Sequence, residues 1–280
     1  METGAHLSAG GPGSGGQVRA ASTISPGPEP GHGWYLKCKQ GDIAERVILV
    51  GDPGRVEVFA KELEGARTVN ANRALITVTG TYRGVTVSVA AFGMGAPIMA
   101  VVLEEVVWLG AKVVLRAGTA MSVAPGWYGR FIVADAAIRG ESTSATYVPM
   151  SYPAVADHRM ASTLSTVLDE LGQDWGLGLI ASYDGFYSEL FALGSRRREE
   201  VFALRATLNS LGAAATDMET SALLTIGRYL GAQCGSLCLV TVDGPTQSAL
   251  DGQEREESEA ALVRAALEAV TRCPIGDSST

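Results

Sequence analysis

The stretch that decides the fold is Val47-Ile48-Leu49-Val50-Gly51-Asp52-Pro53-Gly54-Arg55. Four consecutive apolar residues are typical of a strand buried on both faces, and the glycine that follows indicates a turn. The simplest interpretation of this turn is a strand-to-helix connection capped by Asp52. A buried strand that leads at once into a helix indicates an α/β fold, in which ligands gather at the carboxyl ends of strands.

The same alternation continues along the chain. The apolar patterns predict strands over 47–50, 74–80, 85–91, 113–115, 131–138, 177–182 and 236–242. They predict helices over 97–109, 157–171, 197–211, 219–230 and 254–272. Strands alternating with helices call for a mostly parallel sheet covered on both faces, and 280 residues suffice for one sizeable core.

The two ends of the chain differ from its middle. Residues 1–33 are rich in Gly, Pro, Ser and Ala, so we expect a disordered tail that lacks the features of a secretory signal. Residues 273–280 are expected to form a second flexible end, which leaves 34–272 as the folded domain. No apolar run reaches the roughly 18–20 residues of a membrane span. Four cysteines without a CxxC pair favour reduced thiols and a cytoplasmic location.

The formal net charge of −8 argues against a nucleic-acid surface. An anion site in such an acidic protein has to be built locally, which draws attention to a few arginines. Only three histidines are present, widely scattered, so we expect no metal site.

Arg116 is the most informative of the arginines, because it ends the apolar run 113–115, where a charge is costly to bury without a partner. Gly118 and Thr119 follow, offering a close backbone approach and a hydroxyl. Together with Arg55 and Arg73 they suit a phosphate dianion, because guanidinium forks match phosphate oxygens. The alternatives are a structural ion pair for Arg116 and solvated surface charges for the other two.

Three further elements suit the rest of a ligand. Asp217-Met218-Glu219 is expected to open a helix, where the carboxylates complement the helix dipole or, alternatively, accept hydrogen bonds from ribose hydroxyls. Asp243 is either a turn former or a partner for a leaving group. Phe186 and Tyr187 are either core aromatics or a surface that stacks on a base. Phosphate beside a sugar suggests glycosyl transfer to phosphate.

Taken together, these motifs resemble the nucleoside phosphorylase-I family, which comprises uridine phosphorylases and hexameric-type purine nucleoside phosphorylases. The similarity runs from about Tyr35 to Ala269. It rests on nine or so short motifs in order: 50–56, Asn72-Arg73, Gly93-Met94-Gly95, 104–111, 115–119, 152–157, 184–187, 217–219 and 242–244. The fold that the resemblance implies is a phosphorylase/hydrolase-like three-layer α/β sandwich with a twisted, mixed central sheet.

The resemblance also implies roles for the matching positions. Inorganic phosphate, the co-substrate, would be bound by Gly51, Arg55, Arg116 and Thr119. Arg73 would complete the site of a neighbouring subunit, which implies a homodimer or a hexamer built as a trimer of dimers. The ribose would contact Met218, Glu219 and Tyr35, and the base Phe186 and Asp243. No other cofactor is implied.

Several positions depart from the family pattern. Uridine-specific members read uracil with a glutamine and an arginine, where this chain has apolar residues near Leu190 and Ala192. Asp243 followed by Gly244 favours purines. Tyr35 replaces a histidine that faces the ribose 5′-hydroxyl. Met121 and Ala96 replace glycines and are expected to crowd the phosphate loop.

The sequence therefore favours a nucleoside phosphorylase that cleaves purine nucleosides, with Asp243 and Arg116 as catalytic residues. A uridine phosphorylase, a hydrolytic nucleosidase of the same fold and a non-catalytic binding module stay open as alternatives. We expect neither a nucleic-acid nor a membrane partner.

Overall fold

The computed structural model describes residues 31–276. Its strands are β1 (Arg46–Val50), β2 (Glu64–Asn70), β3 (Thr77–Tyr82), β4 (Val85–Ala91), β5 (Val113–Ser122), β6 (Phe131–Gly140), β7 (Ala154–Val155), β8 (Trp175–Tyr183), β9 (Ala213–Asp217) and β10 (Gln233–Val242). Its α-helices are α1 (Pro53–Lys61), α2 (Ala96–Trp108), α3 (His158–Glu170), α4 (Arg198–Ser210), α5 (Thr220–Tyr229) and α6 (Gly252–Arg272). Short helical turns are η1 (Asn72–Ala74), η2 (Ser144–Thr146) and η3 (Phe186–Leu190).

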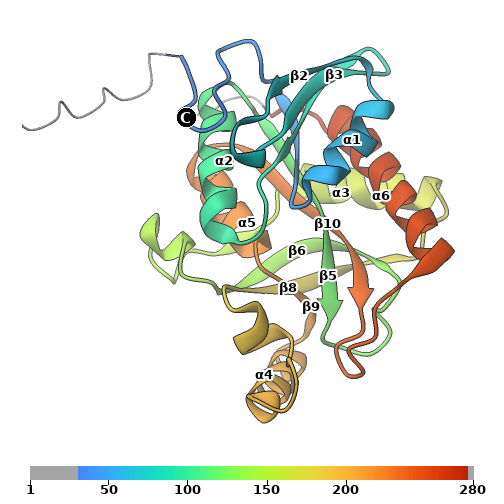
Figure 1. The fold of residues 1–280 in the computed structure, drawn as a ribbon. Helices are drawn as coiled ribbons and strands as arrows, with labels where there is room; N and C mark the ends of the chain where they lie inside the picture. Colours follow the sequence, from blue (N-terminus) through green and yellow to red (C-terminus); the bar gives the residue numbers. More distant parts are fainter. Residues whose placement is uncertain (1–30, 277–280) are drawn as a thin grey trace, which may run out of the picture.

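A mixed ten-stranded sheet in the order β10-β6-β8-β9-β5-β1-β4-β3-β2 forms the middle layer, with β7 added to β6. Strand β10 pairs with β5 as well as with β6, so the strands β5, β10, β6, β8 and β9 close into a ring. Helices α1, α3 and α6 cover one face of the sheet and α2 and α5 the other (Figure 1). The expected three-layer α/β fold with a mixed central sheet is confirmed.

Two apolar clusters hold these layers together. One packs α1, α3 and α6 on β1 and β5 through residues such as Phe59, Leu115 and Leu267. The other packs α2 and α5 on the opposite face. Each fully buried leucine or phenylalanine contributes roughly 1.5–3 kcal/mol of transfer free energy to folding. The clusters therefore hold the helices on the sheet, and this fixes the positions of the strand ends.

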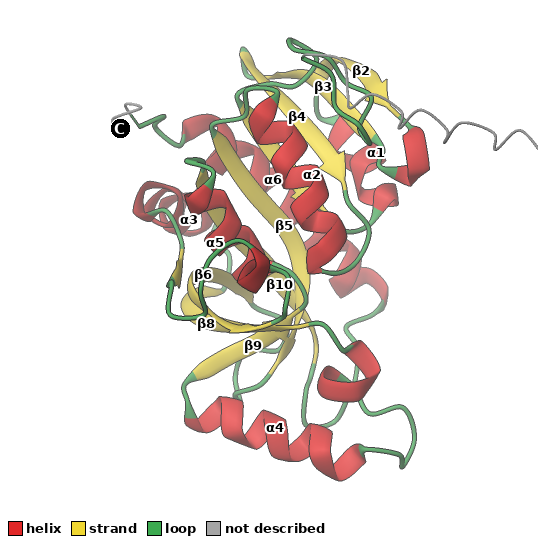
Figure 2. Ribbon diagram, turned by 90° about the vertical axis from the view of Figure 1, so that its left-hand side faces the viewer, coloured by secondary structure: helices red, strands yellow, loops and turns green. Residues whose placement is uncertain are grey.

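Helix α4 lies apart from both layers, beyond the closed end of the sheet (Figure 2). It packs against η3 and β9 rather than on the main core. The carboxyl ends of β5, β9 and β10 and the turn η3 therefore meet between α4 and the rest of the molecule.

The predicted turn after β1 is confirmed. Asp52 is the N-cap of α1, and its carboxylate accepts a hydrogen bond of 2.8 Å from Gly54 N. Gly51 lies so close to the next loop that a Cβ atom there would be 2.9 Å from Gly93 O. Only glycine permits this approach of the two backbones.

The strands differ from the predictions at three places. Strand β5 does not end at Leu115 but continues through Arg116 and Thr119 to Ser122, because Arg116 is neutralised inside the sheet. Asp217 ends strand β9 instead of opening a helix, and α5 begins at Thr220. Strand β2 was not predicted, because this edge strand exposes most of its residues and lacks an apolar alternation.

The ordered domain also extends beyond the predicted boundaries. Residues 1–30 lie outside the described part, but His32 pairs with Lys39 in a β-bridge. At the other end, Cys273 is fully buried, its carbonyl accepts a hydrogen bond from Arg46 Nη1, and Gly276 N donates to Gln233. The four cysteines are free and buried. Within residues 31–276, no helix has the length and apolar character that crossing a bilayer requires.

Candidate active site

A cavity of about 640 Å³ lies where the strand ends meet. Two loops, the residues from Arg116 to Met121 on β5, the end of β9, the turn η3 and the first turn of α6 line it. The cavity brings together seven of the predicted site residues: Gly51, Arg55, Arg116, Thr119, Phe186, Met218 and Glu219. Residues separated by up to 168 positions in sequence thus share one site.

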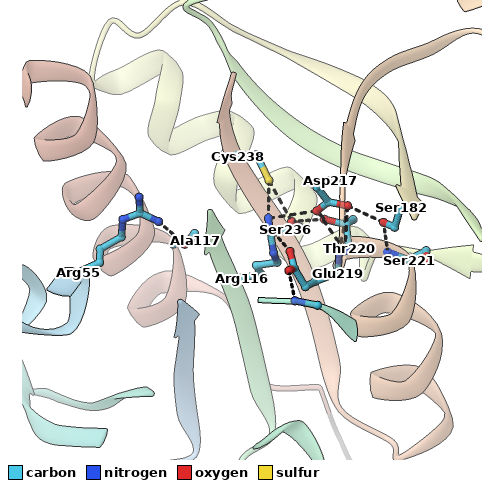
Figure 3. Close-up of polar contacts among 11 residues, drawn as sticks. Arg55, Arg116, Ala117, Ser182, Asp217, Glu219, Thr220, Ser221, Ser236 and Cys238 are labelled. Carbon is cyan, nitrogen blue, oxygen red and sulfur yellow. Dashed lines mark hydrogen bonds and ion pairs between the residues drawn. The ribbon is translucent and has the colours of Figure 1, made fainter. Parts of the chain in front are cut away.

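Arg116 is the centre of the polar part of this site (Figure 3). Its guanidinium lies 2.6 Å from Glu219 Oε2 and 3.3 Å from Asp217 Oδ2, and it donates to Cys238 Sγ at 2.8 Å. Burial opposes the charge on Arg116, but the anionic neighbours outweigh it and raise its pKa. Arg116 therefore stays protonated. Its buried Nε has no hydrogen-bond partner in the described part of the chain.

Gly118 is required for this placement. Residues 116 and 118 point to the same face of β5, and a Cβ atom on Gly118 would lie 2.6 Å from the guanidinium carbon. The arginine side chain therefore folds flat along its own strand, across the glycine. A larger residue at 118 would push the guanidinium away from both carboxylates.

Two carboxylates hold the guanidinium from the other side. Glu219 also accepts a hydrogen bond of 2.7 Å from Gly95 N. This bond connects the loop after β4 to the start of α5. Burial raises the pKa of Glu219, while Arg116 and the Gly95 N–H oppose that shift. Asp217 accepts hydrogen bonds from Ser182 and Thr220, so its orientation is fixed within the sheet.

Arg55 enters the cavity from α1. It donates to Ala117 O at 3.5 Å and lies 3.7 Å from Glu259 of α6. Burial lowers its pKa, and the charge of Glu259 opposes that effect. Arg255 shares the same carboxylate, 3.0 Å from Glu259 Oε1. Its charge at the cavity wall was not predicted, because on a helix rich in Glu and Arg it resembles a solvated residue.

The charges that line the cavity balance one another. Three arginines, Arg55, Arg116 and Arg255, stand against three carboxylates, Asp52, Asp217 and Glu219. A phosphate dianion would therefore meet no excess positive charge from the described residues of a single chain at this cavity. This balance makes any additional cation important for anion binding.

The opposite end of the cavity is apolar. Met121, Leu190, Phe191 and Val242 line it, and Phe186 stacks on Phe191 with ring centroids 5.7 Å apart. Thr216 also lines the cavity, and among the described residues its buried Oγ1 finds no hydrogen-bond partner. It was missed because the strand Ala213–Asp217 was not recognised as one.

Three predicted site residues do not line this cavity. Arg73 and Tyr35 lie together elsewhere, with the guanidinium 5.4 Å from the centre of the ring. Asp243 follows Val242 and accepts hydrogen bonds from Ser122 Oγ and from Thr246 N and Oγ1. The Thr246 hydroxyl is the main cause that lowers the pKa of Asp243, so this carboxylate is ionised at neutral pH.

Of the two glycine replacements, only Met121 reaches the cavity, and it lies at the apolar end. Ala96 is buried at the start of α2. No contact among the described residues therefore supports the predicted crowding of the phosphate loop by Ala96. Met121 occupies space at the apolar end of the cavity.

A family model described as the phosphorylase superfamily matches residues 45–273. The chain belongs to this superfamily. It is 36% identical over 245 residues to a uridine phosphorylase of Thermococcus kodakarensis, covering 86% of this chain and 87% of that one.

Relatives named as purine nucleoside phosphorylases match as well. A DeoD-type purine nucleoside phosphorylase of Geobacillus kaustophilus is 30% identical over 244 residues, covering 85% of this chain and 98% of the relative. A crystal structure of uridine phosphorylase from Vibrio fischeri superposes with a TM-score of 0.77 at 28% identity, covering 85% of this chain and 97% of that chain. These relatives are pentosyltransferases, so the family and enzyme class predicted from the motifs are confirmed.

The Arg116→Met substitution tests whether the buried charge cluster holds the site together. Removing the guanidinium leaves Asp217 and Glu219 buried without a cation, which costs about 3–5 kcal/mol of unfolding free energy. Urea denaturation measures this loss. The control is Arg272→Met, because Arg272 pairs with Glu170 on the surface, where water screens the charges. Equal effects of the two substitutions would contradict the structural role of Arg116.

Proposed function

We propose that this chain is a nucleoside phosphorylase that reversibly converts a ribonucleoside and phosphate into a free base and ribose 1-phosphate, with purine nucleosides favoured. The observation that carries the proposal is the combination of groups that line one cavity. Arginines and Thr119, the carboxylate of Glu219, and an apolar wall with Phe186 and Phe191 all line it. Phosphate, ribose and base need these three environments within one site.

In this proposal, Arg55, Arg116, Thr119 and the backbone of Gly51 hold phosphate beside C1′ of the ribose. As the C–N bond lengthens, its electron pair stays with the base and positive charge develops on the sugar. A fixed phosphate dianion stabilises that charge, and one of its oxygens forms the new bond to C1′. The Arg116 guanidinium lines the cavity, so its positive charge acts on an anion held there. No further cofactor is needed, because phosphate itself is the co-substrate.

Glu219 and Met218 are proposed to hold the ribose. Glu219 is held by Arg116 and Gly95, so its carboxylate is oriented before the sugar arrives. Carboxylates accept hydrogen bonds from vicinal hydroxyls, and the Met218 side chain packs on the apolar face of the sugar.

Two base classes fit the apolar end. A uridine phosphorylase is the second candidate, because relatives of that name match over most of their length. Leu190 and Ala192, however, offer no side-chain hydrogen bond to uracil. A purine presents a larger apolar surface to Phe186 and Phe191, which supports the purine assignment. A hydrolytic nucleosidase is disfavoured, because it has no need for arginines that face phosphate.

Nucleoside cleavage with and without phosphate tests the proposal. Purified protein incubated with inosine, adenosine or uridine should release free base and ribose 1-phosphate only when phosphate is present, with inosine cleaved faster than uridine. Chromatography of the products measures both. Base release at the same rate without phosphate would indicate a nucleosidase instead, and faster cleavage of uridine would favour the second candidate.

Asp243 does not line the cavity itself but directly follows Val242, which does, and we propose that it protonates the leaving purine. Asp243→Asn tests this role. Because Ser122 and Thr246 hold this carboxylate ionised, it has to take up a proton before it can protonate a leaving purine. In the native protein, kcat/KM for inosine should therefore fall as the pH rises. The Asn variant should lose about 10²-fold on inosine and show no such pH dependence.

The control for Asp243→Asn is Asp251→Asn, which changes an exposed carboxylate at the N-cap of α6 whose side chain makes no capping hydrogen bond among the described residues. It should leave inosine cleavage unchanged. Equal losses of Asp243→Asn on inosine and uridine would contradict a role at the purine.

We also propose that the active unit contains at least two copies of the chain. Within one chain, exposed Arg73 stacks on Tyr35, away from the cavity. Tyr35 is held in place by Glu105 at its N–H and by Asn72 at its carbonyl, each at 2.8 Å. This rigid pair supports a contact with the site of a second copy, where Arg73 would add the cation that the balanced cavity lacks.

Subunit complementation tests this assembly. Arg73→Ala and Arg55→Ala should each be nearly inactive alone. After co-expression, hybrid dimers should contain one intact site, and activity should recover to about a quarter of native, because half of the dimers are hybrids. Absence of recovery in confirmed hybrids would place Arg73 outside the neighbouring site.

A further inference from the structure

Arg205 is a buried cation that the mechanism above does not use. It extends from α4 and is only 7% exposed. Among the described residues, no carboxylate forms an ion pair with it. Burial lowers its pKa, and the more distant charge of Asp243 opposes that effect. A buried charge without an ion pair is costly, so its contacts need an explanation.

These contacts reach three separate segments around the apolar end of the cavity. Arg205 donates to Gly244 O after β10, and to Leu190 O in η3 at 3.0 Å. Its Nη2 lies 3.9 Å from Met121 Sδ on β5. Met121 and Leu190 line the cavity, and Gly244 is two residues beyond Val242, which also lines it. One guanidinium therefore joins three segments that enclose the same space.

The fit around Arg205 is tight. A Cβ atom on Gly244 would clash with Ser122 O and would also lie 3.1 Å from both Cδ and Nε of Arg205, so the loop has no room for a side chain at this position. On the other side, the guanidinium lies 4.8 Å from the Phe202 ring. Its planar shape is fixed between the ring and the carbonyls, as is typical of arginine at sites where several acceptors converge.

Arg205 also affects the electrostatics of the cavity. The apolar walls Met121 and Leu190 separate it from the cavity, and they screen its charge much less than water would. Asp243 carries the opposite charge but is partly exposed, so water weakens its field. The net field at this end favours a base edge that carries a carbonyl oxygen over one that carries an amino group.

We propose that Arg205 is a positioning residue that shapes the base end of the cavity and selects bases with a carbonyl oxygen, namely 6-oxopurines and uracil, over adenine. It acts through Met121, Leu190 and Gly244 and does not touch the substrate. This inference rests on the proposed nucleoside phosphorylase function and adds a base class to it.

Arg205→Met tests the inference, with Arg198→Met as the matched control. Arg198 lies on the same helix and stacks on the same Phe202 ring at 5.1 Å, and no hydrogen bond to the cavity segments is seen for it among the described residues. For each variant, steady-state kinetics with inosine, uridine, adenosine and phosphate are measured beside the thermal unfolding midpoint.

Arg205→Met should raise KM for inosine by about tenfold or more and reduce the preference for inosine over adenosine, because the three segments lose their common donor. The KM for phosphate should stay within about twofold, since the anion end is built from other residues. Arg198→Met should match the native protein in all of these values. An unchanged inosine-to-adenosine ratio in Arg205→Met would overturn the inference, as would equal rises in the KM of phosphate and inosine.

Arg205→Lys keeps the inference testable if Arg205→Met fails to fold. Lysine retains the charge but not the planar fork, so the base preference should persist while KM for inosine rises. Loss of the preference with the charge retained would contradict the electrostatic part of the inference.

If the native protein cleaves no nucleoside, the proposed function fails, and calorimetric binding of hypoxanthine and adenine to native protein and Arg205→Met still tests the selection. Equal affinities of native protein for the two bases would then overturn it.

Discussion

The structure depends on one buried cation placed inside a central strand. Arg116 interrupts the apolar run of β5 at a point where the sheet is covered on both faces, and a lone charge there would be prohibitive. Asp217 at the end of β9 and Glu219 before α5 resolve this, because both reach the guanidinium. The interaction joins β5 to the β9–α5 connection, and through Gly95 it also fixes the loop before α2. The residues that stabilise the sheet are thus the same residues proposed to hold phosphate and ribose.

This double use explains the charge balance of the cavity. The carboxylates that make Arg116 tolerable in the sheet also cancel its attraction for an anion, and Glu259 does the same for Arg55 and Arg255. An assembly in which a second copy supplies Arg73 would restore positive charge only where the complete enzyme exists. At the other end of the cavity, no carboxylate of residues 31–276 forms an ion pair with Arg205, and its guanidinium donates to the backbone carbonyls of Gly244 and Leu190, which we propose shape the base end.

The sequence predicted the layers and the family well because those depend on local patterns. The strand Val47–Val50, its glycine turn and the helices around Pro97 and Asp157 are each marked by neighbouring residues. Strand β9 was missed because its three alanines carry no strand preference, and β5 was cut short because Arg116 and Gly118 read as a strand end. Arg255 and Arg205 were missed for another reason. Each lies on a helix rich in charges, and only the tertiary fold shows that one reaches the cavity wall and the other is buried behind it.

A crystal structure of the protein with phosphate and a non-cleavable nucleoside analogue tests the central claim most directly. The account predicts a phosphate ion within hydrogen-bonding distance of the Arg116 guanidinium, Arg55 and Thr119, with Arg116 still paired to Glu219 and with Arg73 of a second copy completing the shell. It also predicts that the sugar hydroxyls donate hydrogen bonds to Glu219 and that the base lies between Phe186 and Met121. A phosphate ion bound away from Arg116, with that guanidinium engaged only by its carboxylates, would contradict the account.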